Sequence, residues 1–163
     1  MKKHWDAWRA FETPIGIVRV FAAGEKVTFI DIAADDAEVG SEGKAKVLAL
    51  AEKELKSYFA GKIKAFTFSV DLSSGTAFQQ SVWRQIAKID FAETKSYADI
   101  AAAIGKPKAS RAVGGAVGSN PVPLVVGCHR VLGASGRITG YSGGDGLPTK
   151  RWLLEHEGLS AKE

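Results

Sequence analysis

A turn-rich segment over residues 71–77 (DLSSGTA) separates two parts of the chain that have different hydrophobic patterns. Before it, β-branched and aromatic residues cluster in short runs, which is typical of strands. After it, apolar residues recur at three- and four-residue steps, which is typical of helices. We therefore predict an α+β fold with an N-terminal lobe over 1–76, containing an antiparallel sheet and a helix, and a mainly helical C-terminal lobe over 77–163.

The elements of the N-terminal lobe follow from apolar spacing and turn residues. Runs rich in Val, Phe and Ile on both sides of a turn that contains glycine predict a hairpin. Apolar side chains at four-residue steps, followed by a glycine, predict an amphipathic helix. The predicted elements are a hairpin over 13–32 with its turn at Ala23-Gly24-Glu25, a loop over 33–44, a helix over 45–60 and a third strand over 65–70.

The C-terminal lobe is predicted to contain helices over 78–89, 97–104, 109–118 and 148–157. Ser96 is a good N-cap for the second of these helices, and Gly105 ends it. The second and third helices are joined by a four-residue turn, which gives the pair the dimensions of a helix-turn-helix motif. Periodicity alone does not separate this motif from other helix pairs.

The predicted helix over 109–118 has an unusual distribution of side chains. Val113 and Val117 form a buried stripe, whereas Gly114 and Gly115 lie in mid-helix, where each costs up to about 1 kcal/mol relative to Ala. Arg111 is the one large side chain on the remaining surface. A closely approaching nucleic-acid backbone and a closely packed second helix both require such a bare surface, so both interpretations stay open.

Positive charge is concentrated in the second part of the chain. Residues 1–76 carry 11 Lys/Arg and 11 Asp/Glu, whereas residues 77–163 carry 11 Lys/Arg and 7 Asp/Glu, which places the whole net charge of +4 there. This imbalance favours an anionic partner such as nucleic acid. Random drift in a small protein is the other interpretation.

Composition excludes several classes of protein. The first residues are too polar for a signal peptide, and no apolar run approaches the roughly 18 residues of a membrane span, so we expect a cytoplasmic protein with no membrane partner. The single cysteine excludes an internal disulfide and a thiolate-rich zinc site. His4, His129 and His156 are too widely spaced for a familiar metal site, so we expect no metal.

Cys128, the single cysteine, follows an apolar run. A lone cysteine in such a setting is most often an inert, small hydrophobic side chain. Here His129 and Arg130 follow it directly, so a base and a positive charge lie near the sulfur and favour its thiolate form. His156 and Glu157, at the end of the last predicted helix, supply a second set of partners if the lobe is compact. These neighbours favour a reactive cysteine.

Several sequence blocks of the C-terminal lobe occur in a characteristic order. SNPVPLVVGCHRV surrounds the cysteine, KSYADIAAAIGKPKASRAVGGAVG precedes it, and ITGYSGG and KRWLLEHEG follow it. Together they resemble the O6-alkylguanine-DNA alkyltransferase family over about residues 78–158, and the predicted hairpin, helix and strand fit the family's smaller N-terminal lobe. The resemblance implies a DNA repair protein that transfers the alkyl group of O6-alkylguanine, with O4-alkylthymine as a further candidate substrate, irreversibly to its own Cys128 in a single turnover.

The resemblance also implies catalytic roles for matching positions. Cys128 accepts the alkyl group, His129 holds it as thiolate through a water, and Glu157 orients that histidine. Asn120 braces the active-site loops. Tyr97 donates its hydroxyl to the guanine ring, so the departing base need not leave as an anion.

Further positions are implied to contact the substrate base. Tyr141 and Ser142 line its pocket, and the backbone N–H of Ser142 bonds the O6 atom. The carbonyl of Val131 meets the exocyclic amine. Pro123 forms an apolar wall for the alkyl group.

The implied partner is double-stranded DNA that carries alkylated bases. Arg111, in the second helix of the helix-turn-helix, enters the duplex and fills the gap left by an extruded nucleotide, since a thiolate cannot reach a carbon atom inside the stack. The small residues of that helix let it lie in the minor groove, which is only about 6 Å wide; they are Ser110, Ala112, Gly114 and Gly115. The resemblance implies a monomer that needs no cofactor.

The chain departs from the family's pattern at Gly127, where proline is usual. Glycine frees the backbone and adds an N–H donor, so the reaction rate, the thiol pKa and the tolerated alkyl size are open. The loop over 143–147 is slightly longer than in some relatives, and the cysteines that bind zinc in the N-terminal lobe of certain members are absent.

Three other functions remain as alternatives. A lesion sensor that shares this fold would flip bases without transfer, but such proteins lack the acceptor cysteine that is present here. A regulatory helix-turn-helix protein with a redox-active cysteine would form a mixed disulfide or sulfenic acid and prefer particular DNA sequences. A cysteine hydrolase would turn over repeatedly.

Overall fold

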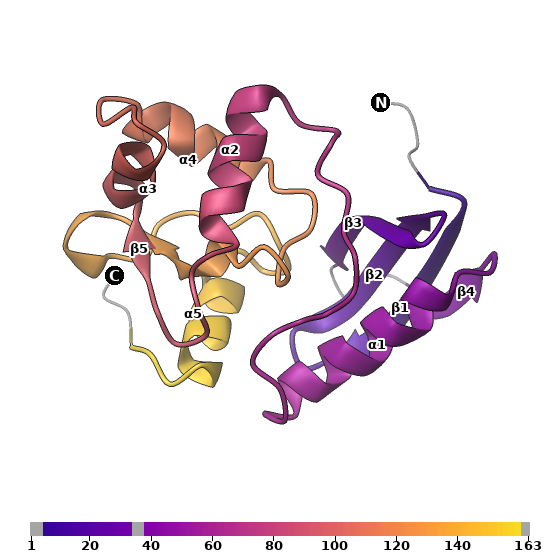
Figure 1. Ribbon diagram of the computed structural model, residues 1–163. Coiled ribbons are helices and arrows are strands. Elements are labelled where there is room, and N and C mark those ends of the chain that lie inside the picture. The colour runs from indigo at the N-terminus through magenta and orange to yellow at the C-terminus, as the bar shows by residue number, and fades with distance from the viewer. Residues whose placement is uncertain (1–4, 34–37, 161–163) are drawn as a thin grey trace. The chain divides into compact units, whose positions relative to one another are not determined.

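The computed structural model describes residues 5–33 and 38–160 and divides into two compact units, Met1–Asp71 and Leu72–Glu163. The predicted boundary between residues 76 and 77 lies slightly further along the chain. The N-terminal unit combines a sheet with a helix, and the C-terminal unit is mainly helical (Figure 1). The predicted α+β class is therefore confirmed.

The N-terminal unit contains a four-stranded antiparallel sheet with the strand order β3-β2-β1-β4 (Figure 1). Its strands are β1 (Ala7–Thr13), β2 (Gly16–Ala23), β3 (Lys26–Ala33) and β4 (Gly40–Glu42). Val18, Val20 and Ala22 are fully buried and alternate with more exposed residues along β2, as expected for a strand with one covered face. The pair β2–β3, which turns between Ala23 and Lys26, confirms the predicted hairpin.

Two strands of this sheet lack a sequence signal. Burial along β1 does not alternate, because Ala10 and Phe11 are both buried while Trp8 and Arg9 are both partly exposed. β4 has three residues, all exposed, and lies within the stretch 33–44 that was predicted to be a loop. Of that stretch, residues 34–37 lie outside the described residues, and Ala33 belongs to β3.

Helix α1 (Lys46–Phe59) covers one face of the sheet and confirms the predicted helix over 45–60. Its apolar side chains form a continuous buried stripe because they recur at three- and four-residue steps; they are Val47, Leu48, Ala51, Leu55, Tyr58 and Phe59. The helix ends before Gly61, whose φ of +76° is a left-handed conformation that favours glycine.

The predicted third strand over 65–70 is wrong. Only Val70 forms a bridge there, with Val27 of β3. The carboxylate of Glu54 in α1 accepts the backbone N–H groups of Thr67 (2.7 Å) and Phe68 (3.3 Å), so these donors are used by a side chain instead of a neighbouring strand. The aromatic residues that suggested a strand are explained by a tertiary cluster, since the ring of Phe66 packs on those of Tyr58 and Phe68.

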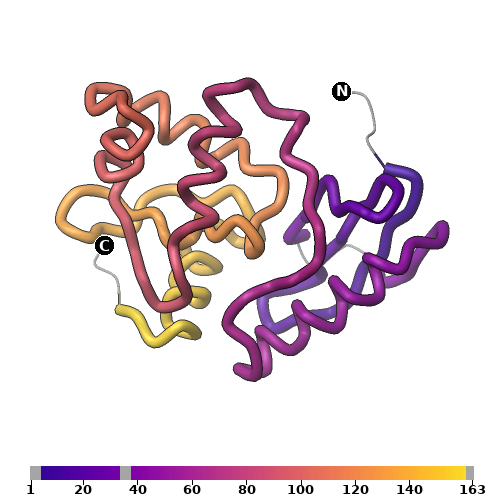
Figure 2. Tube along the Cα trace, in the orientation of Figure 1, coloured from indigo at the N-terminus to yellow at the C-terminus, as the bar shows by residue number. Residues whose placement is uncertain are grey.

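The C-terminal unit contains the helices α2 (Ala77–Ile86), α3 (Tyr97–Ala103), α4 (Ser110–Gly118) and α5 (Leu147–His156). A capping box begins α2 at Thr76, and a second one begins α3 at Ser96, whose hydroxyl accepts the N–H of Asp99 while the Asp99 side chain bonds the N–H of Ser96. Figure 2 shows the short turn that joins α3 to α4. The predicted helix pair is confirmed.

The predicted helix over 78–89 ends three residues early, at Ile86. The N–H groups of Lys88 and Ile89 bond carbonyls three residues before them, so the chain tightens into a turn after α2. Ile89 is nevertheless buried, which explains why it fitted the apolar spacing of the helix.

Short irregular elements complete the C-terminal unit. The strands β5 (Lys95–Ser96) and β6 (Val131–Leu132) form a parallel pair, and two one-turn 3-10 helices, η1 (Cys128–Arg130) and η2 (Ala134–Gly136), flank β6. Across residues 5–33 and 38–160, every helix is too short or too polar to cross a membrane.

Candidate active site

Cys128 begins η1 and is only 5% exposed. The loop before it is folded tightly: Leu124 has a φ of +77°, Pro123 forms a bridge with Val126, and the N–H of Cys128 donates to the carbonyl of Val126 at 2.7 Å. The sulfur therefore lies on a turn that backbone contacts stabilise.

Asn120 bonds the loop that leads to the cysteine. Its Nδ2 donates to the Val126 carbonyl (2.8 Å), and its Oδ1 accepts the N–H of Val122 (3.0 Å). Because the same Val126 carbonyl accepts from Cys128, one side chain fixes both the loop and the start of η1. The bracing role of Asn120 for the active-site loops stays a prediction.

Glu157, directly after α5, is a buried carboxylate that joins three parts of the unit. It accepts from Nε2 of His129 at 2.7 Å, from Nε and Nη2 of Arg130 at 2.9 and 3.0 Å, and from the N–H of Ala92 at 3.0 Å. The two-pronged contact with Arg130 balances the buried negative charge. Arg130 also donates to the carbonyl of Ile89 at 2.8 Å, so its guanidinium is occupied by Glu157 and this carbonyl.

His129 is fully buried, and burial favours its neutral imidazole form. Burial lowers its pKa below the ordinary 6.5, and the neighbouring carboxylate of Glu157 offsets part of this effect. The carboxylate assigns the proton of the neutral ring to Nε2, which leaves Nδ1 as an acceptor. Among the described residues, Nδ1 has no hydrogen-bond partner, so it is available to take a proton.

The surroundings of the Cys128 sulfur favour its thiol form over its thiolate form. Burial raises its pKa, and a hydrogen bond from Asn120 and the positive charge of Lys150 offset only part of this effect. That Cys128 is held as a thiolate stays a prediction. A thiolate has to form within the site, when a base takes the thiol proton.

Lys150 in α5 is a site residue that the sequence analysis missed. It is only 1% exposed, and its Nζ donates to the carbonyls of Val131 (2.7 Å), Thr139 (2.8 Å) and Gly140 (3.3 Å). Burial lowers its pKa to about 8, while the charge of Cys128 acts in the opposite direction. The cation that acts on the sulfur is thus Lys150, and not Arg130 as the sequence order suggested.

The spacing of apolar residues in α5 indicates that Lys150 is buried. Lys150 lies three and four residues before Leu153 and Leu154, which are both buried, so it occupies the core-facing stripe of the helix. A lysine in an apolar stripe indicates a buried charge that needs partners.

The predicted substrate-contacting residues come from separate segments of the C-terminal unit. Pro123 lies half-buried in the loop before η1, Val131 begins β6, and Tyr141 and Ser142 lie between β6 and α5. The carbonyl of Val131 already accepts from Lys150, but a carbonyl oxygen can accept a second hydrogen bond. Their contact with a substrate base stays a prediction.

Tyr97 and the predicted DNA-contacting helix meet at an open cavity of about 580 Å³. Its lining includes Tyr97 at the start of α3 together with Ser110, Arg111 and Gly114 of α4, and also Ala134 and Ser135 of η2. Cys128, Tyr141 and Ser142 are described residues that do not line this cavity. The structure thus brings Tyr97 and Arg111 to one surface.

The glycines of α4 are not explained by packing within the protein. A Cβ atom added at Gly114, Gly115 or Gly118 meets nothing within 4 Å, so no second helix lies against them in the described residues. The buried side of α4 is instead formed by Val113, Ala116 and Val117, and Nε1 of Trp83 in α2 donates to the Ala116 carbonyl at 2.8 Å. The close-packing interpretation of this helix is therefore wrong, and Ala112 and Gly115 face solvent.

Gly127 has a φ of −73°, a value that proline also adopts. An added Cβ would lie 3.0 Å from Nη1 of Arg130, so that guanidinium would have to move by a few tenths of an ångström. Glycine at this position leaves room for Arg130 against η1. The backbone conformation itself does not depend on glycine.

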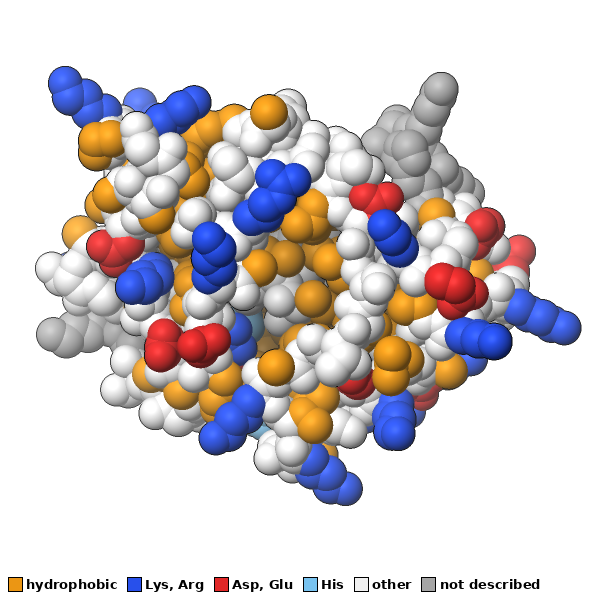
Figure 3. All heavy atoms as spheres, viewed as in Figure 1, with side chains coloured by type: hydrophobic (Ala, Val, Ile, Leu, Met, Phe, Trp, Pro, Cys, Tyr) orange, Lys and Arg blue, Asp and Glu red, His pale blue; other side chains and the backbone are white. Residues whose placement is uncertain are grey.

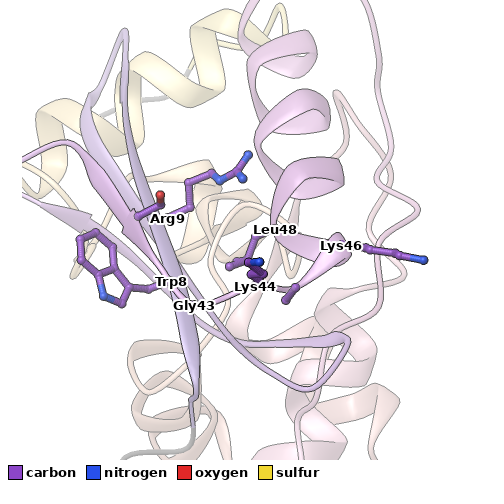
Figure 4. A pocket seen from close by; sticks show the side chains of 8 residues that line it. Trp8, Arg9, Gly43, Lys44, Lys46 and Leu48 are labelled. Atoms are coloured by element: carbon purple, nitrogen blue, oxygen red, sulfur yellow. The ribbon is translucent and has the colours of Figure 1, made fainter.

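A second cavity, of about 250 Å³, lies in the N-terminal unit between the sheet and the start of α1 (Figure 4). Arg9 and Lys44 contribute positive charge to its lining, whereas the side chain of Lys46 points away from the other labelled residues. Arg9 is paired with Glu52 at 3.2 Å. None of the predicted site residues lines this cavity.

Positive charge is spread over the face of the molecule that Figure 3 shows. Figure 3 shows Lys and Arg side chains on the visible face, separated by neutral and apolar atoms. Within residues 5–33 and 38–160, no three His, Cys, Asp or Glu side chains gather in a way that could hold a metal ion.

Comparison with known proteins adds an independent observation. Residues 77–159 match the family described as "6-O-methylguanine DNA methyltransferase, DNA binding domain". The chain is 40% identical over 155 residues to a methylated-DNA–protein-cysteine methyltransferase of Methanosarcina acetivorans (91% of this chain, 96% of the relative), and 41% identical over 160 residues to the constitutive one of Bacillus subtilis (93% and 95%). The fold is similar to the crystal structure of Mycobacterium tuberculosis OGT in complex with DNA, with a TM-score of 0.81, 39% identity and coverage of 93% and 92%.

Proposed function

Because the chain belongs to the methylated-DNA–protein-cysteine methyltransferase family, whose activity is the repair of DNA by alkyl transfer, we propose that its acceptor is Cys128 and that its substrate is O6-alkylguanine in duplex DNA. O4-alkylthymine is a second candidate substrate. The observation that carries the proposal is the buried arrangement of the sole cysteine beside a neutral histidine, which a carboxylate orients. This arrangement combines a nucleophile, a base and an orienting group.

The proposed reaction begins with the thiol. Nδ1 of His129 takes the thiol proton through a water, while the ammonium of Lys150 stabilises the sulfur's negative charge. The sulfur then attacks the alkyl carbon, a C–S bond forms and the C–O6 bond breaks. Tyr97 donates a proton to the departing base and regains one from water, while His129 returns the thiol proton to water. The net reaction therefore moves the alkyl group to sulfur and replaces it on guanine by one proton. Because a thioether has no easy return path, each molecule acts once.

Access to the alkyl carbon requires the damaged nucleotide to leave the base stack. We propose that α4 lies in the minor groove with its glycine surface against the DNA backbone, and that Arg111 fills the gap in the duplex. The open surface at Gly114 and Gly115 and the exposure of Arg111 support this role. Binding of this kind depends on phosphate contacts and is sensitive to salt.

Intact-mass spectrometry tests the proposed acceptor. After mixing with duplex DNA that contains O6-methylguanine, the protein is expected to gain the mass of one methyl group on Cys128, and Cys128→Ala is expected to gain none. Peptide mapping locates the adduct. Repeated turnover, or an unmodified protein beside repaired DNA, would contradict single-turnover transfer to this cysteine.

Arg111→Ala is expected to slow repair of duplex DNA by about tenfold or more, because the gap in the stack is no longer filled, while transfer from free O6-benzylguanine changes less than about twofold. Single-turnover rates with both substrates measure the difference. Arg84→Ala is the matched control, since Arg84 is an exposed arginine on α2 that bonds Gln80 and does not line the cavity. Equal losses on both substrates in Arg111→Ala would refute the flipping role.

The transfer rate is expected to fall with acid only below pH 6.5, because burial lowers the pKa of His129 from that ordinary value and only the neutral ring accepts a proton. Single-turnover rates between about pH 5 and pH 8 measure the midpoint. Stability should fall in the same direction: the unfolded chain binds a proton at His129 at pH values where the folded protein does not, so acid favours unfolding. A midpoint above pH 6.5 would exclude a buried neutral His129 as the base.

A further inference from the structure

We propose that Thr139 is a positioning residue for Tyr97 in alkyl transfer; this inference rests on the proposed function, in which Tyr97 donates a proton to the departing base. The hydroxyl of Thr139 lies 3.0 Å from the phenolic oxygen of Tyr97, 42 residues away in sequence. Within the described residues this hydroxyl is a polar contact of the phenol, and it comes from the segment between β6 and α5.

The backbone positions of Tyr97 and Thr139 are each fixed by neighbouring groups. Tyr97 is the first residue of α3, directly after the capping box of Ser96 and Asp99. The carbonyl of Thr139 accepts from the buried Nζ of Lys150 at 2.8 Å. An added Cβ at Gly133 would lie 3.0 Å from the Thr139 methyl group, so glycine at that position allows the threonine to pack closely.

Either hydroxyl can be the donor in this contact, and one of the two arrangements leaves the phenolic proton of Tyr97 for the substrate. A phenol has one proton and can also accept, and a threonine hydroxyl can do both. When Thr139 donates to the Tyr97 oxygen, the proton of Tyr97 points elsewhere and can be donated to another acceptor. Tyr97 also belongs to the lining of the cavity that contains Arg111. Hydrogen bonds in a chain polarise one another, so the phenol donates more strongly when it accepts from Thr139.

Replacement of Thr139 tests this role without unfolding the protein, because its hydroxyl contributes little to the stability of the fold. The residue and its bond to Tyr97 are exposed, so loss of the bond costs little stability. Thr139→Val keeps the shape and the methyl contact and removes the hydroxyl. Thr139→Ser keeps the hydroxyl and removes the methyl group.

The experiment measures single-turnover transfer from duplex DNA containing O6-methylguanine over a range of protein concentrations. We expect Thr139→Val to lower the maximal rate about fivefold, the rate equivalent of one neutral hydrogen bond, with an unchanged half-saturating concentration. Thr139→Ser is expected to restore at least half of the maximal rate. In a Tyr97→Phe background, which has no phenolic oxygen to position, Thr139→Val is expected to change the rate by less than about 1.5-fold.

The outcomes separate this inference from the proposed function. If the wild-type protein gains no methyl group on Cys128, the proposed function fails first. If the wild type transfers normally and Thr139→Val matches it, the positioning role is overturned. An equal loss from Thr139→Val in the presence and absence of the Tyr97 hydroxyl also overturns it, because the effect would then not pass through the phenol.

Discussion

Glu157→Gln is expected to slow alkyl transfer by about 100-fold or more and to destabilise the protein by about 3–5 kcal/mol. The rate falls because the Gln amide, unlike the carboxylate, does not fix the ring proton of His129 on Nε2. When the amide N–H group donates to Nε2, the ring proton has to lie on Nδ1, which then cannot accept the thiol proton. The stability falls because the buried guanidinium of Arg130 loses its negative partner, while the N–H of Ala92 keeps at best a neutral acceptor.

Two measurements separate these effects. Denaturant unfolding gives the stability, and single-turnover transfer at a temperature where the variant stays folded gives the rate. Glu155→Gln is the matched control, because Glu155 is an exposed glutamate on α5 and its replacement makes the same change in charge. A Glu157→Gln variant that unfolds like Glu155→Gln would show that the buried carboxylate does not carry the charge of Arg130.

Much of the fold was predictable because local signals and tertiary packing agree. The hairpin β2–β3 has strand-forming residues on both sides of Gly24, and α3 begins at the capping residue Ser96 and ends before Gly105. At residues 65–70 the local signal was misleading, since the aromatic side chains serve a cluster around Tyr58 and the backbone donors are taken by Glu54. A side chain of a distant helix that bonds the backbone leaves no trace in local spacing.

The candidate site was likewise predictable only in part. Cys128, His129 and Glu157 were predicted from a sequence block and its resemblance. The structure joins the buried side chains of His129 and Glu157 by a hydrogen bond, and it buries Cys128 next to His129 in the chain. Lys150 and Thr139 were missed because their partners are backbone carbonyls and a phenol from other segments. The burial that raises the pKa of the Cys128 thiol was also missed, since neighbouring residues in sequence do not report how deeply a sulfur is buried.

Replacement of Lys150 is also expected to have a large effect on the transfer rate, because its positive charge lowers the pKa of the Cys128 thiol. Lys150→Met is expected to slow transfer near neutral pH by about tenfold or more, since the thiolate then forms without a nearby positive charge. Cys128 is the sole cysteine, so alkylation by iodoacetamide reports on it alone, and the pH of half-maximal alkylation is expected to rise in the variant. Lys88→Met, which removes an exposed lysine beyond α2, is the matched control and should leave both values unchanged.

The pH dependence of this difference distinguishes a charge effect from a packing effect. Burial lowers the pKa of Lys150 to about 8, so the wild-type ammonium loses its proton as the pH rises through that value. The ratio of wild-type to Lys150→Met transfer rates should therefore narrow between about pH 7 and pH 9. The Lys150→Met variant also loses the hydrogen bonds to the Val131, Thr139 and Gly140 carbonyls, and this loss disturbs the loop at every pH. If the ratio of the two transfer rates stays constant across this pH range, Lys150 acts by holding these carbonyls and not by its charge.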